Sequence, residues 1–275
     1  MTLPRVADLG NGIRRVLAPN PSMMTGPGTN TYLIGGDDVA VVDPGPALPE
    51  HLDRIRAEAG RIRWIFVTHT HPDHSPGAAV LAADTGAELI GMPAPATAHQ
   101  DSSFVPDWHL EDGDSLQTTE FELLAVHTPG HASNHVCYLH AESGALLTGD
   151  HVIDGSTVVI NPPDGNMRDY LNSLRRILEL NVAAILPGHG DRIDDPQRVV
   201  NWIIEHRLAR EDKVVAAFRR RGSATAAELV EDVYQDVPEH LHGWAERSLL
   251  AHLIKLQEDG AAGEESGRFT WREKP

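Results

Sequence analysis

The sequence is poor in cysteine and in long apolar runs. A single cysteine, Cys137, excludes an intramolecular disulfide, so nothing in the chain requires an oxidising compartment. Its alternating context, HVCYLH, predicts a buried structural thiol on a strand. No segment approaches the roughly 18 apolar residues of a membrane helix, and the start, MTLPRVADLG, has neither the basic nor the apolar region of a signal peptide. We therefore expect a cytoplasmic protein that does not bind membranes.

Positive charge is also scarce. The chain has 23 Lys and Arg against 40 Asp and Glu, a formal net charge of −17. The electric field of such a net charge repels polyanions and disfavours broad binding of nucleic acid or anionic membranes. A local basic patch could still bind a polyanion. One candidate patch is Arg219–Arg221. We favour the simpler interpretation, a solvated basic end of a helix that the helix dipole stabilises.

Apolar periodicity predicts two parts of unequal size. Residues 1–195 alternate short strands with helices, which favours an α/β layered domain. Its expected strands are 13–18, 30–35, 38–43, 61–68, 88–92, 121–126, 135–140, 145–149 and 183–188. Its expected helices are 48–59, 75–85 and 167–180, and 91–115 is expected to be loop with at most one short helix. Residues 196–275 predict helices over 196–221, 223–234 and 241–258 and a hairpin over 260–274, with GAAGEESG as its turn. Three helices and a hairpin are typical of a winged-helix-like domain.

Polar side chains of the kinds that bind metals follow four of the expected strands. The first set, in THTHPDH, comes directly after the strand at 61–68, and single residues follow three later strands. Glycine at these turns lets the backbone bend sharply and approach a metal closely. Imidazole nitrogens and carboxylate oxygens suit zinc and other borderline divalent ions. The seven candidate ligands are His69, His71, Asp73, His74, His131, Asp150 and His189.

The motifs H-x-H-x-D-H, T-P-G-H, T-G-D and P-G-H-G, in that order, resemble those of the metallo-β-lactamase fold superfamily. NPSMMTGPGTNTYLIG, DYLNSL and the tail with HLIKLQEDG are similar to its lactamase-beta-like protein 2 group, which has a C-terminal winged-helix-like domain. The resemblance implies an αββα sandwich of two mixed sheets with the ligands along one edge. It also implies that His69, His71 and His131 hold one metal, that Asp73, His74 and His189 hold a second, and that Asp150 bridges them.

Two divalent ions can share a water and lower its pKa to roughly 7, so that hydroxide serves as nucleophile without a catalytic serine or cysteine. We expect two zinc ions per chain, with manganese or iron as alternatives. Asp73 is the candidate to orient the nucleophile and carry a proton to the leaving group. The sequence therefore predicts a binuclear metal-dependent hydrolase.

The sequence does not decide which substrate is hydrolysed. Relatives in the group include single-stranded RNA endonucleases, so RNA is one candidate, and a continuous basic track from the tail to the metal site would favour it. A small thioester, lactone or β-lactam-like amide is the alternative, which the acidic surface tolerates better. An iron-dependent oxidoreductase and a non-catalytic scaffold with structural metals are less favoured hypotheses. The tail is expected to close the cleft or to support a homodimer.

Several further residues lie near the motifs. His135 and His151 are candidates to orient the ligands from behind, although a packed strand histidine or a loop residue explains each equally well. Tyr170 and Asn172 begin a helix that family analogy places beside the mouth of the site, with a core tyrosine and a surface asparagine as the simpler interpretation. His99 and His109, in the irregular segment, are weaker candidates to flank the pocket.

Overall fold

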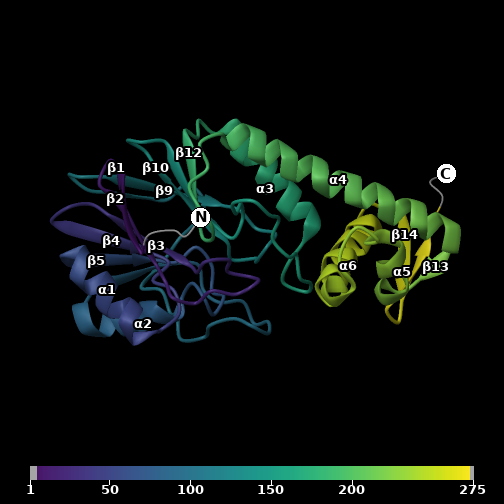
Figure 1. Ribbon diagram of the computed structural model, residues 1–275, viewed down its shortest axis with the longest axis horizontal. Coiled ribbons are helices and arrows are strands. Elements are labelled where there is room, and N and C mark those ends of the chain that lie inside the picture. The colour runs from purple at the N-terminus through teal and green to yellow at the C-terminus, as the bar shows by residue number, and fades with distance from the viewer. Residues whose placement is uncertain (1–4, 273–275) are drawn as a thin grey trace.

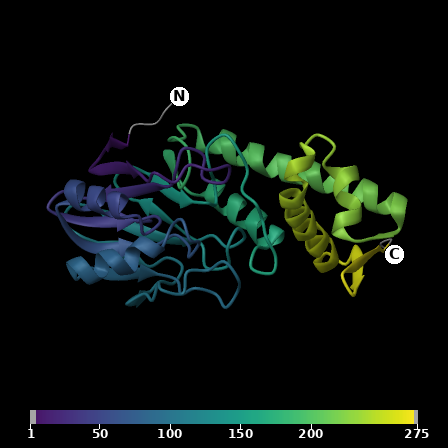
Figure 2. The ribbon, with the colours of Figure 1, turned by 60° about the horizontal axis from the view of Figure 1, so that its bottom comes forward.

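The computed structural model describes residues 5–272. Two sheets pack face to face with helices on their outer sides, and the long helix α4 (Pro196–Arg221) leads to a separate bundle at the far end of the molecule (Figure 1). Figure 2, turned about the horizontal axis, shows the same division into a larger layered part and a smaller helical part. The αββα sandwich with a small C-terminal winged-helix domain, which the sequence predicted, is confirmed.

In the first sheet the strands lie side by side in the same order in which they occur along the chain. It consists of β1 (Val6–Gly10), β2 (Ile13–Leu17), β3 (Asn30–Ile34), β4 (Asp38–Val42), β5 (Arg61–Phe66), β6 (Glu88–Gly91) and β7 (Trp108–His109). β1 to β4 pair antiparallel, and β4 to β7 pair parallel. The helices α1 (Pro49–Ala59) and α2 (Pro76–Thr85) connect β4 to β5 and β5 to β6, and they share an apolar core with this sheet.

The second sheet follows the order β12-β11-β10-β9-β8. Its strands are β8 (Ser115–Gln117), β9 (Glu122–His127), β10 (Val136–His140), β11 (Ala145–Gly149) and β12 (Ala184–Pro187), and only β11 and β12 pair parallel. The helix α3 (Met167–Glu179) and the first half of α4 cover its outer face. Between the sheets lies one apolar core, where Tyr138 also donates a hydrogen bond to the Val67 carbonyl at 2.7 Å.

The C-terminal part packs around the second half of α4. It contains α5 (Ala226–Val233), a 3-10 turn (Glu239–Leu241), α6 (His242–Glu258) and a small sheet of β13 (Ser223–Ala224), β15 (Arg268–Trp271) and β14 (Ala262–Glu265). Thr225 and Glu228 form the capping box that starts α5, as the sequence indicated. Because α4 contributes to the cores of both parts, the division at residue 195 stays a prediction.

Some predicted elements need correction. Strand β1 was not predicted, because short edge strands have little periodicity of their own. For the same reason the expected loop at 91–115 contains β7 and the first residue of β8, and this described segment has no helix. The helix expected to begin at Ser223 begins at Ala226, since Ser223 and Ala224 pair with β15. β14 occupies part of the expected turn, where pairing with β15 overrides the weak strand propensity of AGEE. Residues 273–274 of the expected hairpin lie outside the described residues.

Among the helices of residues 5–272, none combines the length and the apolar composition that crossing a bilayer requires.

Gly130 allows α3 to approach the T-P-G-H turn. Its φ of +138° is one that other residues rarely adopt, and a Cβ there would lie 2.3 Å from the Tyr170 Cα. We expect Gly130→Ala to destabilise the protein by at least about 2 kcal/mol, through backbone strain and overpacking. The matched control is Gly243→Ala in α6, where an added Cβ meets nothing within 4 Å and should be neutral or stabilise by up to about 1 kcal/mol. Equal urea midpoints for the two variants would contradict this account.

Candidate metal centre

The seven candidate ligands meet at one edge of the sandwich. β9, β11 and β12 run in the same direction, because β10 is antiparallel to both β9 and β11 while β12 is parallel to β11. Their carboxyl ends therefore lie at one edge, and each is followed by a candidate ligand: His131, Asp150 and His189. The segment after β5 reaches this edge from the first sheet, where the Thr68 carbonyl accepts a hydrogen bond from the Val136 amide at 2.8 Å.

Three histidines form the first donor group. The Nδ1 atom of His71 lies 3.0 Å from Nε2 of His69 and 3.1 Å from Nε2 of His131. These ligand atoms all fall within 4.8 Å of one another. The structure thus brings together the residues of H-x-H and T-P-G-H, which are some sixty positions apart in the chain.

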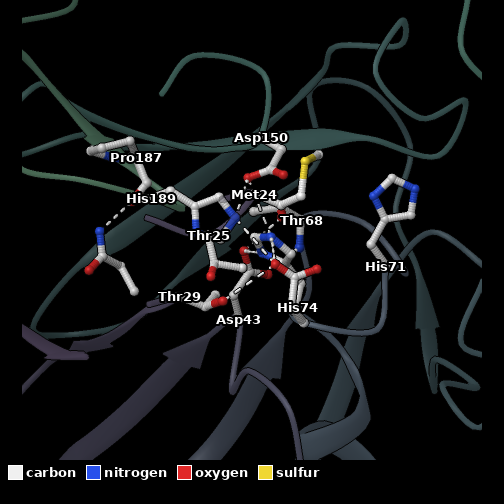
Figure 3. A network of polar contacts seen from close by, with 12 residues as sticks. Met24, Thr25, Thr29, Asp43, Thr68, His71, His74, Asp150, Pro187 and His189 are labelled. Atoms are coloured by element: carbon white, nitrogen blue, oxygen red, sulfur yellow. Dashed lines mark hydrogen bonds and ion pairs between the residues drawn. The ribbon is translucent and has the colours of Figure 1, made fainter. Parts of the chain in front are cut away.

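Asp73, His74 and His189 form the second donor group. The Oδ2 atom of Asp73 lies 3.2 Å from Nε2 of His189 and 3.4 Å from Nε2 of His74. Figure 3 shows the side chains of His74 and His189 directed toward Asp150, with Met24 close to them. The two groups adjoin each other, since ligand atoms of His69, His74 and Asp150 also lie within 4.8 Å of one another.

Asp150 lies between the two groups. Its Oδ2 is 3.7 Å from Nε2 of His131, and its Oδ1 is 3.4 Å from Nε2 of His74 and 3.1 Å from Nε2 of His189. Nε2 of His74 and Oδ1 of Asp150 are buried without a hydrogen-bond partner. Such atoms are costly unless something else binds them. The donor set of imidazoles and carboxylates, with lone pairs left free at its centre, fits two divalent metal ions.

Asp43 orients ligands of both groups, and sequence analysis gave it no role. Its carboxylate accepts hydrogen bonds from the Thr68 amide (2.7 Å), the Thr68 hydroxyl (2.7 Å) and Nδ1 of His74 (2.9 Å). Because the Thr68 hydroxyl gives its proton to Asp43, it accepts from Nδ1 of His69 at 3.0 Å. The signal that could have found Asp43 is its place directly after an apolar strand, which it shares with the predicted ligands.

Backbone carbonyls fix two other ligands. Nδ1 of His131 donates to the Val159 carbonyl at 2.9 Å, and Nδ1 of His189 donates to the Gly28 carbonyl at 3.2 Å. In each case the outer nitrogen is the donor to the carbonyl, so Nε2 is the atom directed to the centre of the site, where it can bind a metal once it is deprotonated. His71 is the exception, because it turns Nδ1 inward.

The electrostatics of the site keep its carboxylates ionised. Burial alone would raise the pKa of Asp73, but the adjacent His74 and the hydrogen bond from His189 lower it. For Asp150, burial is likewise outweighed by His189 and His74, and its pKa lies well below the usual range. Burial would lower the pKa of His189, but Asp150 raises it to about 10. Burial lowers the pKa of His71 to about 3, which leaves a neutral imidazole able to bind a metal.

Two of the weaker candidates, His135 and His151, lie behind the donors. His135 stacks on His69 with ring centroids 5.0 Å apart and contacts the Thr128 hydroxyl through Nδ1 at 2.9 Å. The ring of His151 packs on Tyr170 with centroids 4.8 Å apart, and both side chains are fully buried. These residues support the site from within the core.

The four other weak candidates have different surroundings. Tyr170 is buried and donates to the His151 carbonyl at 2.9 Å, which agrees with the simpler interpretation of a core tyrosine. Asn172 is exposed and accepts from Arg175. His99 lines a cavity beside the donors, whereas His109 is exposed on β7 and is not among the residues that line either of the two cavities at the site.

Two cavities open beside the donors, with volumes of about 510 and 330 Å³. The larger one extends between residues 153–159 and the helices α4 and α6, and the smaller one lies against residues 98–100. The residues that line both are Met24, His131, Asp150, Val159, His189 and Trp244. Trp244 belongs to α6 and is 39% exposed, so the C-terminal part forms a wall of the cleft, one of the two roles expected of the tail.

The basic triplet at the end of α4 lies elsewhere. Arg221 pairs with Asp232 at 2.8 Å, and the guanidinium of Arg219 lies 4.7 Å from the centroid of the Trp271 ring. These residues pack within the C-terminal part and are absent from the lining of both cavities. From Arg210, which lines the larger cavity, to Arg219 is about 14 Å along the helix axis.

Comparison with known families agrees with this geometry. Residues 24–189 match the family model described as the metallo-beta-lactamase superfamily, and residues 225–271 match the beta-lactamase associated winged helix domain. The chain belongs to the metallo-beta-lactamase superfamily. The resemblance inferred from the motifs is therefore confirmed, including the similarity to beta-lactamase-like protein 2.

Among curated proteins, a Beta-lactamase-like protein 2 homolog of Drosophila melanogaster is 32% identical and aligns over 94% of this chain and 92% of its own length. The Atrochrysone carboxyl ACP thioesterase of Aspergillus fumigatus is also 32% identical, over 86% of this chain and 78% of its own. Among solved structures, a metallo-beta-lactamase family protein of Thermus thermophilus superposes with a TM-score of 0.80 at 23% identity, covering 96% of this chain and 100% of its own. The last similarity concerns the fold alone.

The role of Asp43 can be tested by truncation. Asp43→Ala removes the acceptor for three buried donors, and we expect a loss of at least about 3 kcal/mol in the free energy of unfolding. The control is Asp53→Ala, because that carboxylate is 76% exposed and pairs with Arg56 on the surface, where an ion pair contributes little. Urea denaturation of both variants without added metal gives the comparison. A urea midpoint for Asp43→Ala close to that of Asp53→Ala would show that Asp43 does not stabilise the site.

Proposed function

We propose that the protein is a metal-dependent hydrolase of thioesters and similar activated acyl esters. The observation that carries the proposal is the pair of donor groups, joined by Asp150, at the meeting point of two cavities. The larger cavity is lined in good part by apolar side chains, among them Met23, Pro27, Ile153, Val158, Val237 and Leu241. Its volume of about 510 Å³ is within the range of small-molecule sites. A relative that is named as an acyl carrier protein thioesterase supports this substrate class.

Seven side chains would hold the metals, as the sequence predicted. His69, His71 and His131 would bind one ion, Asp73, His74 and His189 the other, and Asp150 both. When bound, two zinc ions would supply Lewis acid catalysis and lower the pKa of a water molecule. Zinc is the proposed metal because nitrogen-rich sets with carboxylates suit it, and the same donors accept manganese or iron.

The chain's own groups position the reactants and move the proton. Asp73 lines the smaller cavity, and Thr29 donates to its Oδ2 at 3.4 Å, which holds the carboxylate toward His74 and His189. There it can orient the attacking water and accept its proton. In hydrolysis a C–O bond forms between that oxygen and the thioester carbonyl carbon, the C–S bond breaks, and the thiol leaves with the proton that Asp73 held. Met24 and Trp244 line both cavities and give their junction an apolar surface that an acyl chain can contact.

The cavity walls favour this substrate class over single-stranded RNA. Their arginines are Arg207, Arg210 and Arg247, and their carboxylates are Asp73, Asp150, Asp154 and Asp164. Arg210 is already paired with Asp236 at 2.7 Å, and the basic triplet at 219–221 is remote from the cavities. RNA binding rests on rows of cations that neutralise phosphates. Cleavage of RNA stays a prediction, and the charged residues of the cavity walls do not support it.

The proposal is tested with two substrates in parallel. The zinc-loaded protein should release thiol from a medium-chain acyl thioester of N-acetylcysteamine. The isosteric change Asp73→Asn should lower kcat by at least about 100-fold, because the amide cannot accept a proton. End-labelled single-stranded RNA is incubated with the same preparations, and Asp53→Ala is the control for each. Zinc-dependent cutting of RNA without thiol release would replace this proposal by the ribonuclease hypothesis, and inactivity toward both substrates would reject both.

A further inference from the structure

We propose that Arg207 forms a subsite for a carboxylate on the α4 wall of the larger cavity, so that the preferred acyl group ends in a carboxylate. The choice of a thioester for the other end of the ligand rests on the proposed function. The subsite itself rests on four features: a buried cation, the absence of a partner carboxylate, unpartnered polar atoms on other residues of the cavity, and a lining that also includes residues of the donor groups.

Arg207 differs from the other buried arginines. Arg15, Arg207 and Arg210 are 2%, 4% and 6% exposed. Arg15 lies 3.0 Å from a carboxylate oxygen of Asp191, and Arg210 lies 2.7 Å from one of Asp236. Within residues 5–272, Arg207 has no carboxylate within the 4.0 Å of an ion pair. Buried charges are normally paired, so Arg207 is a cation that lacks its anion.

The guanidinium is held in place without being neutralised. One Nη atom donates to the Val158 carbonyl, and the guanidinium carbon lies 5.5 Å from the centroid of the Tyr170 ring. The Nε atom is buried and has no hydrogen-bond partner. The side chain is therefore preorganised, and binding an anion costs it little conformational entropy.

Neighbouring polar atoms are also unsatisfied. The hydroxyl of Tyr234 and Nδ1 of His206 are buried without partners, and both residues line the same cavity as Arg207. A hydroxyl and a guanidinium are the donors that a carboxylate uses in charge-assisted hydrogen bonds. Arg207, His206 and Tyr234 thus line one cavity, and each has a polar atom without a partner in the protein.

The charged residues that line the cavity favour a ligand group with a single negative charge. Arg210 is neutralised by Asp236, and Asp150 and Asp154 line the cavity too. A phosphate dianion would meet this acidic surface with only one free guanidinium to offset it, whereas a carboxylate matches that guanidinium. His131, Asp150 and His189 line the same cavity. An acyl chain within it can therefore place its thioester at the donors and its far end at Arg207.

The test compares matched acyl thioesters of N-acetylcysteamine whose chains of four to ten carbons end in a carboxylate or in its methyl ester. The wild-type protein should prefer the carboxylate by about 10- to 100-fold in kcat/KM at the best length, as expected for a buried charge-assisted hydrogen bond. Arg207→Met should reduce that preference to near unity, and Arg207→Lys should keep part of it. The preference is a ratio within one variant, so a general loss of folding or of metal cancels.

Controls separate this proposal from the proposed function. Arg247→Met changes an arginine of the smaller cavity and should keep the wild-type preference. Binding of adipate and of hexanoate is measured by calorimetry in the same proteins. Tighter binding of adipate that Arg207→Met abolishes supports the subsite even if no thioester is cleaved. Thioester cleavage with equal rates for carboxylate and methyl ester at every length, or with a preference that Arg207→Met retains, overturns the subsite while the proposed function stands.

Discussion

The site depends on one buried carboxylate, that of Asp43. Through Thr68 it fixes the ring of His69, and directly it fixes the ring of His74, so that one anion orients a ligand of each donor group. The same carboxylate accepts the Thr68 amide just beyond β5, which ties the end of β4 to the start of the H-x-H segment. Without this anchor the rings of His69 and His74 would lose their fixed orientation, and a metal that binds there would have to order them at a cost in affinity.

The sandwich supplies the rest of the geometry. Strand ends from both sheets deliver donors to one edge, and contacts between the sheets keep these ends in register. The Asn30 amide donates to the Gly188 carbonyl at 2.8 Å, next to His189, and Tyr32 donates to the Pro187 carbonyl at 2.8 Å. The C-terminal part then completes the cleft. Ser248 and Arg207 reach Ile160 and Val158, on either side of the Val159 carbonyl that orients His131. The C-terminal part therefore helps to fix the carbonyl that orients His131, in addition to lining the cavity.

How much the sequence predicts depends on how local the cause is. The seven donors lie in short motifs that follow apolar strands, so each could be found from neighbouring residues, and the capping box of α5 is equally local. The place of Asp43 directly after β4 marks it in the same way but does not show which groups it contacts, and Arg207 and Tyr234 carry no such mark. The roles of all three arise from contacts with Thr68, with Val158 and with the cavity, and these contacts exist only after the sheets and α4 have packed. Strands β7 and β14 were not predicted for the same reason, since pairing with β6 and β15 makes them strands and their own residues give little signal.

The central claim is that two donor groups share Asp150, and metal content measures it most directly. Protein loaded with zinc and dialysed against metal-free buffer is assayed by mass spectrometry for metal per chain. We expect two zinc ions per chain for the wild type and at most one for Asp150→Ala, because that carboxylate faces both groups. One ion or none in the wild type, or two ions retained by Asp150→Ala, would contradict it.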